Sequence, residues 1–155
     1  MQLTTHLSNP DETTALARRL GAVLGAGDTV LLHGDVGAGK THFARALIQS
    51  LLASPEDVPS PTFTLVQTYD AASGVEIWHA DLYRLTDATE IEELGLLDAM
   101  EAAICLIEWP DRLTSLTPDD ALDITLAPAD ADDHRILTAA WSHPRWDAKL
   151  TDWIP

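Results

Sequence analysis

The sequence predicts a three-layer α/β domain with a mainly parallel central sheet and antiparallel additions. Residues 29–33 and 102–107 are short apolar runs, which is the pattern of strands buried on both faces in a parallel sheet. Segments with helical spacing of apolar residues alternate with strand-like segments along the chain. Residues 122–126 alternate in polarity and precede residues 135–140 across an acidic turn, which predicts an antiparallel hairpin.

The amino-terminal elements are predicted to be a short edge strand at residues 4–7 and a helix. Asn9 is expected to cap this helix, with Pro10 as its first residue and Glu12 completing a capping box. Apolar residues then recur at helical spacing as far as Leu24, where two nearby glycines are expected to end the helix.

The middle of the chain predicts a second helix and two strands. The strand at 29–33 leads through a glycine-rich turn into a helix that ends before Pro55. A loop stiffened by prolines follows. Residues 63–69 and 75–80 then have the composition of strands, separated by a segment rich in turn residues.

The later helices are predicted from their caps and spacing. Asp87 precedes Glu90 by three positions, which predicts a capped helix that continues through Met100 toward the strand at 102–107. A closing amphipathic helix is expected around Trp146, Leu150 and Trp153, and we interpret this stripe as core packing.

The composition predicts one globular domain, residues 1–155, located in the cytoplasm. No apolar run approaches the ~18–20 residues that span a membrane, and no basic, apolar targeting segment opens the chain. Twenty-five acidic against nine basic residues give a net charge of −16, which repels a polyanion, so any nucleic acid is expected to be held by a partner. Cys105, the single cysteine, lies in an apolar run and is expected to be a core residue.

A phosphate-binding motif follows the first central strand. Residues 34–41, GDVGAGKT, have the Gly-x-x-x-x-Gly-Lys-Thr spacing of the P-loop, placed between a strand and a helix as that motif requires. Its glycines let backbone amides approach phosphates, and the helix amino terminus favours the same anion. Lys40 is expected to bridge the β- and γ-phosphates and Thr41 to coordinate Mg²⁺. The expected fold is therefore a P-loop NTPase-like domain.

Two carboxylates lie where a P-loop site needs one, at the end of a neighbouring strand. Glu108 follows the apolar run ICLI, and Asp81 follows the strand predicted at 75–80, on the same strand face as His79. Either could be the direct metal ligand. Thr62, in a proline-flanked loop, is placed where a hydroxyl can sense the γ-phosphate. The predicted catalytic residues are Glu108, Asp81 and Lys40, the predicted metal ligands are Thr41, Glu108 and Asp81, and the predicted nucleotide contacts are Gly34, Asp35, Val36, Gly37, Ala38, Gly39, Lys40, Thr41, His42 and Thr62.

Other residues near these motifs have more than one interpretation. Trp109, next to Glu108, is either a core or lid aromatic or a residue close to the nucleotide. Arg84, Arg112 and Arg135 could each supply a cation for the developing phosphate charge. The histidines have no second ligand at metal-site spacing, so no zinc site is predicted.

Small GTPases and small-molecule kinases also carry a P-loop. A small GTPase would need an Asn-Lys-x-Asp base reader and an Asp-x-x-Gly switch, and the sequence contains neither. A small-molecule kinase is the alternative, because several such enzymes have about this length. Those enzymes usually carry an arginine-rich lid, whereas the arginines here are scattered singly apart from Arg18 and Arg19.

Four motifs, in order, resemble the TsaE (YjeE) family. They are GDVGAGKT at 34–41, SPTFT at 60–64, HADLYRL at 79–85 and IEWP at 107–110. The last two are far more specific than the P-loop, and the resemblance runs from about residue 11 to 113. His42 stands where the family often has a second threonine, and Ala80 stands where an aromatic residue is frequent.

The resemblance implies an ATPase needed for bacterial synthesis of N6-threonylcarbamoyladenosine in tRNAs that read codons beginning with A. Members bind the TsaB–TsaD heterodimer and do not transfer the threonylcarbamoyl group, so tRNA is met only through that complex. ATP and Mg²⁺ are the implied cofactors, with slow hydrolysis alone and stimulation by the complex. Carried over, Lys40 and Thr41 hold Mg-ATP and Thr62 senses the γ-phosphate. Asp81 and Glu108 then serve the metal and hydrolysis, and the segment up to Thr13 lines the adenine pocket.

Overall fold

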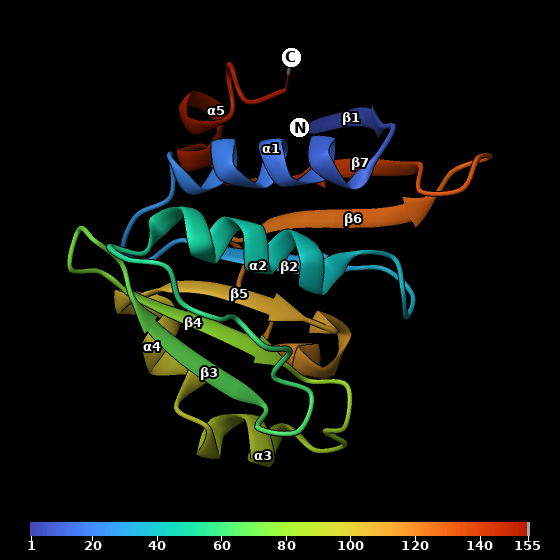
Figure 1. Cartoon of the computed structure of the whole chain (residues 1–155). Helices are drawn as coiled ribbons and strands as arrows, with labels where there is room; N and C mark the ends of the chain where they lie inside the picture. Colours follow the sequence, from blue (N-terminus) through green and yellow to red (C-terminus); the bar gives the residue numbers. More distant parts are fainter. Residues whose placement is uncertain (155) are drawn as a thin grey trace.

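Seven strands form one mixed sheet whose centre is parallel (Figure 1). The computed structural model describes residues 1–154. The strand order is β1-β7-β6-β2-β5-β4-β3. Strands β6, β2, β5 and β4 are parallel neighbours, while β1, β7 and β3 add antiparallel pairings at the two sides, as the sequence predicted. The strands are β1 (Gln2–Leu7), β2 (Thr29–His33), β3 (Val66–Asp70), β4 (Glu76–Asp81), β5 (Ile104–Glu108), β6 (Leu122–Pro128) and β7 (Arg135–Ala140).

Helices cover both faces of this sheet and complete the three layers (Figure 1). Helices α1 and α2 pack on one face with the carboxyl-terminal segment, and α3, α4 and a 3-10 helix, η1, pack on the other. Within residues 1–154, none of the helices has the length and apolar character needed to cross a membrane. The helices are α1 (Pro10–Gly21), α2 (Lys40–Leu51), α3 (Ala88–Glu93), α4 (Leu96–Ala102), η1 (Pro110–Leu116) and α5 (Arg145–Lys149).

Helix α1 begins as predicted and ends early. The Asn9 side chain accepts from the Glu12 amide at 2.9 Å, and the Glu12 carboxylate accepts from the Ser8 amide at 2.8 Å, one residue before the cap. The prediction that the helix continues to Leu24 is wrong, because it ends at Gly21. Tight turns follow, in which the Leu24 amide donates to the Gly21 carbonyl at 3.3 Å, so Leu24 still packs on the core without belonging to the helix.

Two further predicted boundaries are corrected. The strand expected from residue 63 begins only at Val66, because Leu65 has a φ of 69° and its amide closes a turn on the Pro61 carbonyl at 2.7 Å. The single helix expected after Asp87 is two helices, separated at Gly95, whose φ of 79° cannot continue a right-handed helix.

The closing helix is also shorter than expected. Helix α5 ends at Lys149, so two of the three residues that predicted it lie beyond it. Their predicted place in the core is confirmed, because Trp146, Leu150 and Trp153 are all buried. Cys105 is buried in β5, as the sequence predicted.

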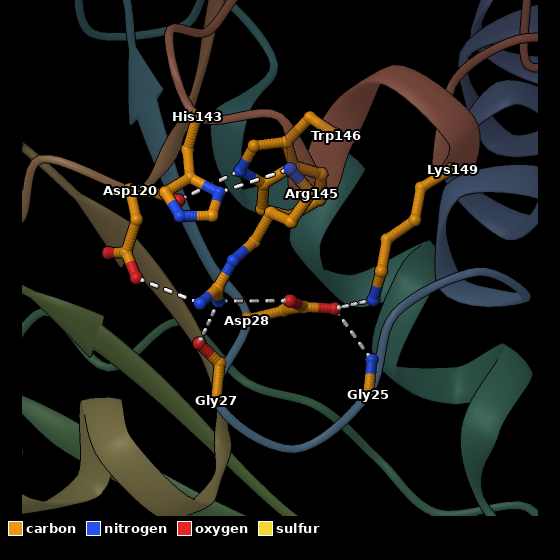
Figure 2. Close-up of polar contacts among 8 residues, drawn as sticks. All are labelled: Gly25, Gly27, Asp28, Asp120, His143, Arg145, Trp146 and Lys149. Atoms are coloured by element: carbon orange, nitrogen blue, oxygen red, sulfur yellow. Dashed lines mark hydrogen bonds and ion pairs between the residues drawn. The ribbon is translucent and has the colours of Figure 1, made fainter.

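A buried carboxylate joins the carboxyl-terminal segment to the start of β2 (Figure 2). The Asp28 side chain is 4% exposed, forms an ion pair with Lys149, and lies 3.5 Å from the Arg145 guanidinium. It also accepts from the Gly25 amide at 2.8 Å. Arg145 pairs in addition with Asp120 at 3.1 Å. Because β2 runs from this cluster to the P-loop, the cluster lies at the opposite end of the sheet from the predicted site.

Candidate active site

The predicted site residues gather where the parallel strands end. In neighbouring strands β4 and β5, Asp81 is in register with Glu108, and Glu108 is in register with Leu32 of β2. The P-loop directly follows β2 and leads into α2. Because parallel strands present their carboxyl ends at one edge, the two acids and the P-loop face a common space.

The P-loop backbone has the conformation that its glycines allow. Gly34 has a φ of 142°, and a Cβ at this position would lie 2.6 Å from the Leu126 carbonyl oxygen. Helix α2 follows Gly39, and within residues 1–154 no side chain caps it and no acid lies in its first turn. Its first N–H groups and its positive dipole end are therefore left for an anion.

Lys40, the first residue of α2, contacts neutral groups through its ammonium. It is 5% exposed. Its ammonium donates to the carbonyl of Gly34 and lies 3.6 Å from the ring centre of Trp109. Burial lowers the pKa of Lys40, and the carboxylates of Glu108 and Asp81 oppose that shift. Within residues 1–154, the hydrogen bonds of this ammonium go to the backbone carbonyls of Gly34 and Asp35.

Glu108 joins two elements through its two oxygens. The side chain is 2% exposed. Its Oε1 accepts from the Thr41 hydroxyl of α2 at 2.8 Å, and its Oε2 lies 2.7 Å from the Nε2 of His79 in β4. Hydroxyl and carboxylate oxygens are the hard ligands that Mg²⁺ prefers. Thr41 and Glu108 together therefore fit a divalent cation.

Asp81 contacts a different hydroxyl. Its Oδ2 accepts from the Thr62 hydroxyl at 3.0 Å, and its Oδ1 accepts from the Tyr83 amide at 3.0 Å. The loop that carries Thr62 is fastened by Arg84, which donates to the carbonyls of Thr62 at 2.9 Å and Phe63 at 2.6 Å. The two acids therefore have different partners. Glu108 contacts α2, and Asp81 contacts the loop that carries Thr62.

Two adjoining cavities open over these residues, of about 400 Å³ and 150 Å³. Of the described residues that the sequence predicts for the site, Gly34 and Asp81 lie outside the lining of the larger cavity. Asp81 reaches it through Thr62. The larger cavity is lined by Asp35, Val36, Gly37, Ala38, Gly39, Lys40, Thr41, His42, Thr62, Tyr83, Glu108 and Trp109, and the smaller by Pro10, Thr13, Ala38, Gly39, His42, Asp133 and Arg135.

A comparison with known families shows which proteins this chain is similar to. A family model described as threonylcarbamoyl adenosine biosynthesis protein TsaE matches residues 7–137. The chain belongs to the TsaE family. The match includes all four motifs and extends past residue 113, through β6 and into β7.

Individual TsaE proteins agree with this family match. The tRNA threonylcarbamoyladenosine biosynthesis protein TsaE of Rickettsia felis is 42% identical over 120 residues, which is 77% of this chain and 70% of that one. The protein of the same description from Bacillus subtilis is 37% identical over 139 residues, 88% of this chain and 84% of that one. The crystal structure of Bacillus subtilis YdiB matches with a TM-score of 0.79 at 28% identity, covering 99% of this chain and 94% of that chain.

In this TsaE-family chain, each of the three arginines that could supply a cation for the phosphates binds a backbone carbonyl beside the site. Arg84 fastens the Thr62 loop, Arg112 donates to the Tyr83 carbonyl at 3.2 Å, and Arg135 donates to the Ala38 carbonyl at 3.1 Å. Sequence reasoning missed the support that Arg135 gives to the P-loop, because 97 residues separate the two partners.

Sequence reasoning also missed the bond between His79 and Glu108. The shared strand face of His79 and Asp81 was visible from their spacing. The partner of His79 lies 29 residues away, on the next strand, and no local pattern indicates it.

Proposed function

We propose that this chain is a Mg²⁺-dependent ATPase that drives the TsaB–TsaD complex in tRNA threonylcarbamoyladenosine synthesis. It would act in the cytoplasm and meet tRNA only through that complex. The observation that carries the proposal is the uncapped start of α2 with Lys40, Thr41 and Glu108 around it, in a member of the TsaE family. This arrangement supports binding of a triphosphate and a divalent cation at one place.

Each residue has a role that follows from its contacts. The Lys40 ammonium would exchange its carbonyl contacts for oxygens of the β- and γ-phosphates. The Thr41 hydroxyl gives its one hydrogen to Glu108, which leaves its lone pairs free for the cation. Bound Mg²⁺ would neutralise the charge that develops on the phosphates. We assign Thr41 and Glu108 to the metal and place Asp81 farther from it, because Asp81 bonds instead to Thr62.

Hydrolysis would use the Thr62 loop. When the Thr62 hydroxyl turns toward a γ-phosphate, it gives up its hydrogen bond to Asp81 Oδ2. That carboxylate oxygen becomes able to accept a hydrogen bond from a water molecule and to orient it. Arg84 holds the backbone of the loop while the side chain changes partner. The Asp81–Thr62 bond is therefore proposed as the contact that distinguishes the two nucleotide states.

The smaller cavity would take the adenine base. It adjoins the P-loop through Ala38 and Gly39, and Pro10 and Thr13 also line it. His42 lines both cavities, and its Nε2 lies 3.0 Å from the Thr14 hydroxyl, which links α1 to α2 at this point. The implied role of the segment up to Thr13 is compatible with this position.

Two features favour a protein partner over direct contact with tRNA. The net charge of −16 opposes a polyanion. Two apolar side chains beside the site, Val36 at 79% and Phe63 at 83%, are exposed. Because Val36 belongs to the P-loop and Phe63 follows Thr62, a protein that covered them would touch both parts of the site.

Phosphate release from Mg-ATP by the purified protein tests the proposal, with and without the TsaB–TsaD pair and tRNA. Release should be slow alone and rise in the complex. Lys40→Ala and Glu108→Ala should abolish it, while Glu92→Ala, at an exposed acid on α3, should leave it unchanged. Full activity in both site variants would exclude this site. Transfer of label from γ-labelled ATP to a small acceptor, with no free phosphate, would favour a small-molecule kinase instead.

A further inference from the structure

His79 lies behind the proposed site as a fully buried ring with one polar contact. Its exposure is 0%, and its Nε2 lies 2.7 Å from the Oε2 of Glu108. Its other ring nitrogen, Nδ1, has no hydrogen-bond partner within residues 1–154. In the register of β4 and β5, His79 is opposite Leu106, so it reaches diagonally across the strand pair to Glu108. The roles proposed above for Lys40, Thr41 and Asp81 do not use this histidine.

The contact between His79 and Glu108 shows which ring nitrogen donates. A carboxylate accepts hydrogen bonds and cannot donate them, so the hydrogen of the His79 ring belongs on Nε2. Nδ1 takes no part in this contact and has no hydrogen-bond partner within residues 1–154. The ring therefore acts toward Glu108 as a donor that is fixed in place by the core around it.

The contact continues through the carboxylate to the helix. With Oε2 held by His79, the plane of the Glu108 carboxylate is fixed and Oε1 faces Thr41. Oε1 accepts the hydroxyl hydrogen of Thr41, and this direction turns the lone pairs of Thr41 away from Glu108. Without His79, the carboxylate could rotate, and the Thr41 hydroxyl could donate elsewhere.

We propose that His79 is a positioning residue that orients Glu108 and, through it, the Thr41 hydroxyl toward a divalent cation. This inference rests on the proposed function, because it assigns the orientation of two residues proposed there as metal ligands. It differs from the role of Asp81, which contacts the Thr62 loop and neither Thr41 nor Glu108 among the hydrogen bonds of residues 1–154.

Two variants with an amide side chain, His79→Gln and His79→Asn, distinguish a positioning role of His79 from a role in core packing alone. In His79→Gln the side-chain amide nitrogen can reach the place of Nε2, whereas in His79→Asn the same group is one methylene shorter and cannot reach Glu108. His79→Leu removes the donor altogether. If His79 only fills the core, the two amide variants should behave alike.

The first measurement is binding of Mn²⁺ in the presence of ADP, by electron paramagnetic resonance. His79→Asn and His79→Leu should weaken Mn²⁺ binding by about 10- to 100-fold, the usual cost of losing a group that orients a metal ligand. His79→Gln should stay within a few-fold of wild type. ADP affinity in EDTA should be equal in all four proteins, because Lys40 and the P-loop bind phosphates without the cation.

The second measurement is turnover. In His79→Asn and His79→Leu, kcat should fall while KM for ATP at saturating Mg²⁺ changes little, and His79→Gln should restore kcat. Thermal unfolding of each variant identifies any that fails to fold. For that case a ¹⁵N-histidine spectrum of the wild-type protein supplies an independent test, since it must show the His79 hydrogen on Nε2.

The outcomes distinguish this inference from the proposed function. If wild type binds Mn²⁺–ADP and His79→Leu binds it equally well, the positioning role is wrong and the proposed function stands. Equal losses in His79→Gln and His79→Asn, or an Nε2 that carries no hydrogen, would also overturn the positioning role. If wild type binds no metal–nucleotide, both proposals fail.

Discussion

Replacing Asp28 with asparagine should destabilise the fold without touching the proposed site. Asp28 is the acceptor that ties α5 to the beginning of β2, through Lys149, Arg145 and the Gly25 amide (Figure 2). Asp28→Asn keeps the shape of the side chain and an oxygen for the Gly25 amide. It removes the charge that the two cations share.

The magnitude follows from the exposure of the partners. Removing one member of a fully buried ion pair costs about 3–5 kcal/mol. Here Asp28 is 4% exposed, but Arg145 and Lys149 are 31% and 30% exposed, so both cations recover some hydration after the change. Arg145 also keeps Asp120 at 3.1 Å. We therefore expect a loss of about 2 kcal/mol in the free energy of unfolding, below the fully buried value, or about 4–8 °C in Tm for a chain of this size.

Urea denaturation followed by tryptophan fluorescence measures this loss. Asp120→Asn is the matched control, since its carboxylate pairs with the same arginine but is 41% exposed, and it should change stability by less than about 0.5 kcal/mol.

The reasoning would be refuted by either of two results. One is Asp28→Asn within about 0.5 kcal/mol of wild type, which would mean that the cations lose nothing when the carboxylate is neutral. The other is an equal loss in Asp120→Asn, which would place the stabilising charge at the surface. Adding Lys149→Met to the wild-type protein and to Asp28→Asn completes a double-mutant cycle. The cycle measures the interaction energy between Asp28 and Lys149 directly.

Four other predictions concern the P-loop, Cys105 and Trp109. Gly34→Ala should abolish nucleotide binding because its Cβ would meet the Leu126 carbonyl, whereas Gly25→Ala, with open space around its Cβ, should bind labelled ATP normally. Burial raises the pKa of Cys105 to about 12 from its ordinary 9.0, so near pH 8 a thiol reagent should react only with unfolded protein. The neutral thiol adds stability below pH 9.0 that is lost as pH rises toward about 12, which pH-dependent urea titrations would detect. Trp109→Phe should remove most of any nucleotide-induced fluorescence change, since the ring contacts Lys40.

The fold was predictable where the pattern is local and periodic. The apolar strands, the Asn9 cap and the β6–β7 hairpin follow from neighbouring residues alone. The errors occur at boundaries where apolar spacing continues after the backbone has changed. Leu24 still packs on the core from a turn, and the helix expected after Asp87 keeps its apolar face across the break at Gly95.

The candidate site was predictable because its residues occupy fixed places in the P-loop arrangement. A strand end supplies each acid and a helix start supplies Lys40 and Thr41, so order along the chain is enough to bring them together. The pairing of hydroxyls with acids was not predictable. Nothing in the spacing indicates that Thr41 bonds Glu108 while Thr62 bonds Asp81, since these depend on how α2 and the loop pack.

The buried acids have different partners at the two ends of the sheet. Within residues 1–154, the buried carboxylates are Asp28, Asp81 and Glu108. Asp28 pairs with two cations, so its charge is balanced within the cluster. Glu108 and Asp81 receive their hydrogen bonds from hydroxyl, amide and imidazole groups, and Lys40 is the nearby cation whose charge acts on both. Under the proposed function, a divalent cation bound at the P-loop end would offset the charge of these two acids, both of which act on Lys40.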